Sequence, residues 1–120
     1  MATGNFSHSC GNVRLRDERY LRADCLTVSG NKGNTTELDL SLCYANEEDG
    51  SLTIKEDGDG FGVKKCLKCD LWDNHTLACM CTLHGVEGNE RGGSVDLDEV
   101  IENFGGVLGC FSSRGKYTSD

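Results

Sequence analysis

The chain of 120 residues contains no proline and no long apolar run, and it has few basic residues. A membrane helix needs about 20 consecutive apolar residues, so we expect no membrane partner. Lys and Arg number 12 against 20 Asp and Glu, which gives a net charge of −8. Because a nucleic-acid binder needs a basic surface, we expect no nucleic-acid partner either.

Without proline, the turns must be formed by Gly, Asn and Asp, and the chain contains 16 glycines. Short, partly alternating runs lie between these turn residues, a pattern that predicts a mainly β protein. Only helical turns fit at residues 40–46 and 97–103, where Asp39 and Asp96 are candidate N-caps. The chain length predicts a single domain.

An internal repeat covers most of the sequence. Cys10 and Cys25 are separated by 15 positions, and so are Cys66 and Cys81. Further matched positions are Leu15 with Leu71, Leu21 with Leu77, Asp39-Leu40 with Asp96-Leu97, and Asn46 with Asn103. The first repeat spans residues 5–52 and the second spans residues 60–108. Because a unit of about 50 residues buries little core alone, we expect the two repeats to fold together.

The pattern resembles that of the cyanovirin-N homologue (CVNH) family, through residues 6–10, 21–25, 38–40 and 95–108. The resemblance implies one cyanovirin-N-like domain over residues 1–120, with two intertwined, pseudo-symmetric pseudo-domains. Each pseudo-domain would hold a triple-stranded sheet and a β-hairpin. Pseudo-domain A would comprise about residues 1–43 and 100–120, and pseudo-domain B about residues 44–99. Residues 111–120 are polar and unpatterned, which predicts a flexible tail.

The resemblance also implies the disulfides Cys10–Cys25 and Cys66–Cys81. Within the second loop, Cys69 and Cys79 would face each other across an antiparallel hairpin, so a third bridge is expected. The resemblance places Cys43 and Cys110 together in pseudo-domain A. A Cys43–Cys110 bridge is one alternative there, and the other is two thiols with Cys43 buried as a small apolar side chain.

A zinc site is the competing interpretation of the second cysteine group. Cys66-x-x-Cys69 and Cys79-x-Cys81 place four sulfurs within sixteen residues, with His75 and His84 nearby. The repeat accounts for Cys66 and Cys81 without a metal, because they match Cys10 and Cys25. We therefore expect no metal and no cofactor.

The resemblance implies a non-catalytic lectin for mannose-rich glycans, especially those with α1,2-linked mannose ends. No histidine lies in a nucleophile–base motif, so we expect no enzyme activity. The alternative is a disulfide-stabilised structural or interaction domain whose sugar sites have degenerated. The cysteine content suggests a secreted protein, although this chain carries no signal-peptide pattern.

The resemblance implies one sugar site in each pseudo-domain. Site A would comprise Asn5, His8, Ser9, Leu26, Thr27, Val28, Asn103, Phe104 and Gly105. Site B would comprise Asn46, Asp49, Gly60, Phe61, Lys65, Thr82, Leu83 and His84, next to Ala45. Each site departs from the family pattern: Gly105 replaces an acidic residue, Ala45 replaces a glutamate, and Lys65 replaces a small hydroxyl residue. These departures favour site A as the stronger one.

Two further expectations concern aromatic residues and assembly. Phe6 and Phe61 are expected in the core, and Trp72 is expected to pack over Leu77 rather than stack on a sugar. The linker at residues 53–60 is rich in Asp and Gly, so it can fold back without strain. We therefore expect a monomer.

Overall fold

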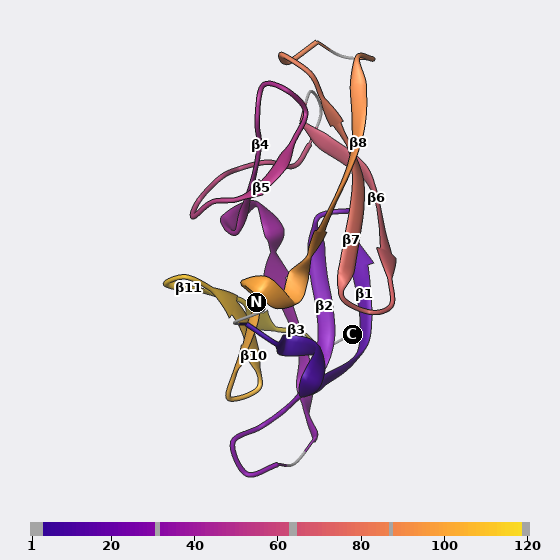
Figure 1. Ribbon diagram of the computed structural model, residues 1–120. Helices are drawn as coiled ribbons and strands as arrows, with labels where there is room; N and C mark the ends of the chain where they lie inside the picture. The colour runs from indigo at the N-terminus through magenta and orange to yellow at the C-terminus, as the bar shows by residue number, and fades with distance from the viewer. Residues whose placement is uncertain (1–3, 31, 63–64, 87, 119–120) are drawn as a thin grey trace.

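Antiparallel strands form most of the computed structural model, which describes residues 4–30, 32–62, 65–86 and 88–118 (Figure 1). The mainly β class expected from the sequence is confirmed. The three helical segments are single 3-10 turns: η1 (Phe6–His8), η2 (Leu40–Leu42) and η3 (Leu97–Glu99). No helix among the described segments has the length and hydropathy of a membrane span.

The two repeats build two sheets of the same design. In the first, β1 (Cys10–Arg16), β2 (Tyr20–Leu26) and β3 (Lys32–Asp39) are neighbours; in the second, β6 (Cys66–Trp72), β7 (Thr76–Thr82) and β8 (Glu90–Asp96) are neighbours. Both first hairpins have a bulge at the same place, after Gly11 and after Leu67. The central strands β2 and β7 alternate between buried and partly exposed residues, as a strand with one face on the core does.

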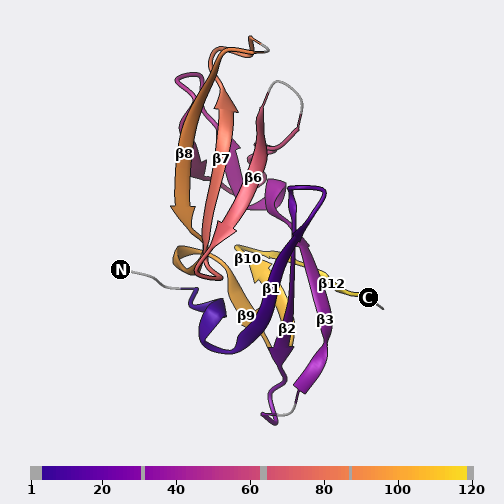
Figure 2. The ribbon, with the colours of Figure 1, turned by 90° about the vertical axis from the view of Figure 1, so that its right-hand side faces the viewer.

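Each repeat gives its final hairpin to the other repeat's sheet. The hairpin of β4 (Tyr44–Asn46) and β5 (Leu52–Ile54) lies against β8, and β10 (Val107–Cys110), which pairs with β9 (Glu102–Phe104), lies against β2 and β3. Figures 1 and 2 show β10 beside the first sheet and β4–β5 beside the second. This exchange produces the intertwined, pseudo-symmetric fold; the residue boundaries of the pseudo-domains stay a prediction.

The expectation of a flexible tail is wrong for residues 113–117. They form β11 (Ser113–Arg114), which pairs with β10, and β12 (Lys116–Tyr117), which pairs with β3. Edge pairing uses backbone hydrogen bonds, so it needs no apolar alternation that a sequence pattern would reveal. Arg114 also stacks its guanidinium 3.4 Å from the centre of the Phe104 ring. Residues 119–120 of the expected tail lie outside the described part of the chain.

The expected helix caps are confirmed, although the helical turns are shorter than residues 40–46 and 97–103. The Asp39 carboxylate accepts a hydrogen bond from the Ser41 N–H, and the Asp96 carboxylate accepts one from the Asp98 N–H, both at 3.0 Å. The same cap in both repeats ends each third strand and redirects the chain toward the hairpin that is exchanged.

Four disulfides join the core: Cys10–Cys25, Cys66–Cys81, Cys69–Cys79 and Cys43–Cys110. A disulfide sulfur is not a thiolate, so the second cysteine group does not offer the zinc ligands considered above. The first three bridges join neighbouring strands, whereas Cys43–Cys110 joins residues 67 positions apart. Phe6 and Phe61 are buried, at 0% and 2% exposure, in the core where the sequence places them.

Candidate functional site

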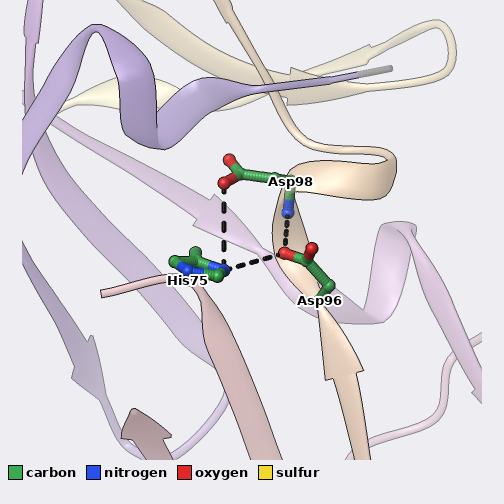
Figure 3. Close-up of side chains that lie close together, drawn as sticks. All are labelled: His75, Asp96 and Asp98. Carbon is green, nitrogen blue, oxygen red and sulfur yellow. Dashed lines mark hydrogen bonds and ion pairs between the residues drawn. The ribbon is translucent and has the colours of Figure 1, made fainter. Parts of the chain in front are cut away.

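One cluster in the described ranges brings three metal-ligand side chains together: His75, Asp96 and Asp98, with ligand atoms within 4.8 Å of one another (Figure 3). Each carboxylate already binds protein groups. Asp96 accepts from His75 Nδ1 at 3.0 Å and from the Asp98 N–H at 3.0 Å. Asp98 accepts from both the N–H and the hydroxyl of Ser7. The cluster therefore connects η1 and η3 to the β6–β7 turn. The atoms that could bind a metal already form hydrogen bonds within the protein.

This cluster predicts a pH-dependent component of stability. The hydrogen bond and charge of Asp96 raise the pKa of His75 above its ordinary value. Protonated His75 therefore stabilises the fold below the unfolded pKa of about 6.5, and this contribution is lost as pH rises through the folded pKa. We expect His75→Gln to remove this decline, measured by urea unfolding from about pH 5 to pH 8. His84→Gln is the control, and equal pH dependence in both variants would contradict the assignment.

At site A, Asn103 joins three segments that lie far apart in the sequence. Its Nδ2 donates to the Ser9 hydroxyl and to the Leu26 carbonyl, each at 2.9 Å. Its Oδ1 accepts from the Gly106 N–H at 2.7 Å. The amide of Asn103 is thus engaged with the protein on both sides, and its main effect is to position the neighbouring segments.

The other predicted residues of site A lie around this junction. Val28 is 92% exposed and Leu26 is 44% exposed, so both project from the surface. The Thr27 hydroxyl lies 3.1 Å from that of Ser29, and the side chain of His8 is exposed. Asn5 has a left-handed backbone, and Phe104 lies under Arg114. Gly105 has φ +67°, and a Cβ there would lie 3.1 Å from Val28 Cγ2.

Site B forms a hollow of about 320 Å³ next to β4 and the end of β7. Its lining residues are Asn46, Glu47, Glu48, Gly58, Asp59, Lys65, Thr82 and Gly85. Asn46 Nδ2 donates to the Thr82 carbonyl at 3.1 Å, and the Thr82 hydroxyl donates to the Lys65 carbonyl at 3.0 Å. The hollow therefore joins the exchanged hairpin to the sheet of the second repeat.

The polar groups at site B are only partly engaged. Asn46 Oδ1 is buried, and no donor in the described part of the chain reaches it. Lys65 Nζ binds Asp59 Oδ2 at 2.7 Å, and this contact lowers the pKa of Asp59. A buried acceptor without a partner costs about 1–3 kcal/mol, so Asn46 Oδ1 favours any ligand that donates a hydrogen bond there.

Not every predicted residue of site B lines the hollow. Phe61 is buried in the core, and Gly60 lies against the backbone of Ala45, where a Cβ would meet the carbonyl carbon at 2.8 Å. Both residues are therefore structural. Asp49 is exposed and accepts from the Ser51 N–H at 3.0 Å within the β4–β5 turn. His84 is joined to the opposite wall, because its N–H donates to the Glu48 carbonyl at 2.7 Å.

The lining also includes residues that sequence reasoning missed: Glu47, Glu48, Gly58, Asp59 and Gly85. The acidic residues resemble ordinary solvated turns in the sequence. The available signal was their position beside Asn46 and Gly60, which the resemblance had already selected.

Comparisons with known proteins agree on the fold. The sequence profile described as the CVNH domain matches residues 6–109. Microvirin, in its complex with mannobiose, is 28% identical, with 91% of this chain and 100% of that chain covered and a TM-score of 0.67. The CVNH of T. borchii is 27% identical, with 89% and 99% covered and a TM-score of 0.68. A MoCVNH3 variant in complex with (N-GlcNAc)4 has a TM-score of 0.75 at 18% identity, with 92% and 99% covered, which shows likeness of fold alone. No curated protein sequence matches the chain.

Proposed function

This chain belongs to the CVNH domain family, and we propose that it is a carbohydrate-binding lectin for glycans with α1,2-linked mannose ends. The proposal draws on the similarity to microvirin, whose structure is described as a mannobiose complex. The four disulfides of the present chain favour an oxidising, extracellular environment. We further propose that binding involves no catalysis, so a glycan incubated with the protein is recovered unchanged.

The observation that carries the proposal is the Oδ1 atom of Asn46, which is buried at the site B hollow and accepts no hydrogen bond from the described residues. A sugar presents hydroxyl groups in fixed directions, and each hydroxyl can donate to such an acceptor. A site built in this way discriminates against analogues that lack the hydroxyl, because its buried polar group would again be unpaired. The hollow needs no metal to do this.

The sequence favours site A as the stronger site, but the contacts favour site B. Asn103 Oδ1 already accepts from the Gly106 N–H, whereas its counterpart Asn46 Oδ1 has no donor among the residues that the structure describes. The difference follows from the turns. Two residues separate β9 from β10, so the Gly106 N–H lies next to Asn103, while the longer β4–β5 turn is closed by the Asp49 side chain instead. We propose site B as the principal site and site A as the weaker one.

Asn46→Ala is expected to weaken mannobiose binding about tenfold, because one hydrogen bond to a buried group is lost. The measurement is a titration with mannobiose, followed by the backbone amide NMR shifts of residues around the hollow. Asn103→Ala is the matched control from the other repeat and should leave these shifts nearly unchanged. Equal losses in both variants, at preserved fold, would remove site B from its leading place.

The alternative function, an interaction domain without a sugar ligand, gives a different result in the same titration. It would leave all amide shifts unchanged at millimolar mannobiose.

We propose that the protein is a monomer, so light scattering on the titration samples should give the mass of one chain, 13.0 kDa. A monomer can bind a branched glycan tightly only if both of its sites bind sugar, because the second site then binds at a high effective concentration.

A further inference from the structure

The outer face of the β6–β7–β8 sheet has a second hollow, of about 450 Å³ and away from the residues of sites A and B. We call it the Trp72 hollow; its lining residues are Lys68, Asp70, Trp72, Ala78, Cys79, Met80, Gly92, Gly93 and Ser94. Its volume falls in the range of about 300–1,000 Å³ that is usual for small-molecule sites. Figure 2 shows the three strands side by side.

Trp72 is 56% exposed here, so the expectation that it packs over Leu77 is wrong. In the hairpin Trp72 is paired with Thr76, while the next pair, Leu71 and Leu77, has its side chains on the opposite face. Leu77 is fully buried in the core. Strand alternation therefore places the indole on the outer surface, where one of its faces can meet a ligand.

The equivalent face of the first repeat shows why the hollow exists. The row Arg14–Arg22–Glu37 in β1–β2–β3 corresponds to the row Asp70–Ala78–Ser94 in β6–β7–β8. In the first repeat, Arg22 Nε donates to Glu37 at 2.8 Å, and Arg16, at the position of Trp72, donates to the same carboxylate at 2.7 and 2.9 Å. Those long side chains fill the part of their sheet that corresponds to the Trp72 hollow, and a smaller hollow of about 270 Å³ remains between Arg16, Glu37 and Arg114.

In the second repeat, small side chains leave the same surface open. Ala78 and Ser94 replace the Arg22–Glu37 pair, and Gly92 has no side chain at all. Trp72 borders the cleared area on the edge strand β6, and Met80 lies on the central strand β7. A flat ring can therefore approach the sheet closely beside the indole.

The charges around the Trp72 hollow suit a neutral polar ligand. Lys68 and Asp70 carry opposite signs, and Lys68 Nζ lies 3.2 Å from Glu90 Oε1. No single sign dominates, so neither an anion nor a cation is selected. The ammonium, the carboxylate and the Ser94 hydroxyl can instead exchange hydrogen bonds with hydroxyl or amide groups.

We propose that the Trp72 hollow is an additional sugar subsite that stacks one pyranose ring on the indole. A pyranose with equatorial substituents, of the glucose or N-acetylglucosamine type, presents a face made of C–H groups. Such a face matches an aromatic ring, while its equatorial groups point toward the polar rim. This inference rests on the proposed lectin function, but it involves neither Asn46 nor Asn103.

Trp72 is the only tryptophan in the chain, so fluorescence excited at wavelengths that the three tyrosines do not absorb reports on this hollow. Titration of the oxidised protein with di-N-acetylchitobiose should change the emission of Trp72 in a saturable way. For variants without the indole, binding is measured by amide NMR. Trp72→Phe should keep part of the affinity for the disaccharide, and Trp72→Ala should bind it about tenfold more weakly. Asn46→Ala and Asn103→Ala should leave the fluorescence titration unchanged.

The matched control refills the hollow without altering Trp72. The double variant Ala78→Arg and Ser94→Glu rebuilds the pair that covers the first repeat, and it should abolish the fluorescence response. An unchanged response in this variant, or none in the wild type, would overturn the subsite. So would an emission shift that depends on protein concentration without sugar, because a second copy would then occupy the hollow. Mannobiose shifts around Asn46 test the proposed function separately, so the two can fail independently.

Discussion

Replacing Cys43 and Cys110 together with alanine is expected to lower the free energy of unfolding by about 4 kcal/mol. Their disulfide closes a loop of 67 positions, and the stabilisation from restricting the unfolded chain grows with loop length. It also joins the end of η2 to β10, a strand of the exchanged hairpin. Losing it removes the covalent link between the second repeat's hairpin and the first repeat's core, so that the hairpin is held there by non-covalent contacts, among them those with β2 and β3. Urea unfolding of the oxidised variants is the measurement.

The control is the double variant of Cys69 and Cys79, whose bridge spans 10 positions inside the loop closed by Cys66–Cys81. Because that outer bridge already restricts the hairpin, removal of the inner one should cost clearly less. A larger loss from the inner pair would contradict the loop argument.

A reductant should lower the stability of the wild type strongly, while a chelator should have no effect. Unfolding by a chelator would instead support a zinc site.

Glu37→Gln is expected to cost about 2–3 kcal/mol, because hydrogen bonds to a buried charged group are weakened while Arg16 stays partly exposed to solvent. Glu37 is 4% exposed, and its carboxylate accepts from Arg16 and Arg22. Glutamine keeps the shape but removes the negative charge that Arg16 and Arg22 share, while Arg16 keeps its ion pair with Asp17. Glu90→Gln is the control, because its partner Lys68 is 63% exposed and exposed pairs contribute at most about 1 kcal/mol.

The same carboxylate gives a pH signature. The hydrogen bond from Arg16, supported by Arg22, lowers the pKa of Glu37 to about 2. The ion pair therefore stabilises the fold above the unfolded pKa of about 4.3, and this contribution is lost as the pH falls toward about 2. Urea unfolding at a series of acidic pH values should show this loss in the wild type and a smaller one in Glu37→Gln. Parallel curves would contradict the role given to the pair.

Local patterns in the sequence were sufficient for much of the fold. The cysteine spacing of 15, the matched leucines and the capping Asp39 and Asp96 correspond to features that each repeat forms within a few strands. The paired tail at residues 113–117 had no such signal, because its partners are the backbones of β10 and β3.

The candidate sites were predictable only as neighbourhoods. The resemblance selected Asn46 and Asn103 as equivalent residues, but it gave no sign that the amide oxygen of Asn103 is engaged while that of Asn46 has no partner within the described ranges. That difference depends on the turn that follows each asparagine and on what the folded chain places beside it. Phe61 was likewise selected for site B by the resemblance, but the structure buries it in the core, where it cannot contact a ligand.

The sequence by itself determined the repeat and the strand-rich class, because alternation and spacing act between residues close along the chain. The pairing of Cys10 with Cys25 and of Cys66 with Cys81 came from the family resemblance. Only the tertiary structure decided which surfaces are open. In the first sheet, Arg16, Arg22 and Glu37 fill the middle of the surface, while the second sheet leaves Trp72 exposed above small side chains. Whether a surface is filled depends on side chains from three strands that meet only after folding, and no single strand's sequence contains that information.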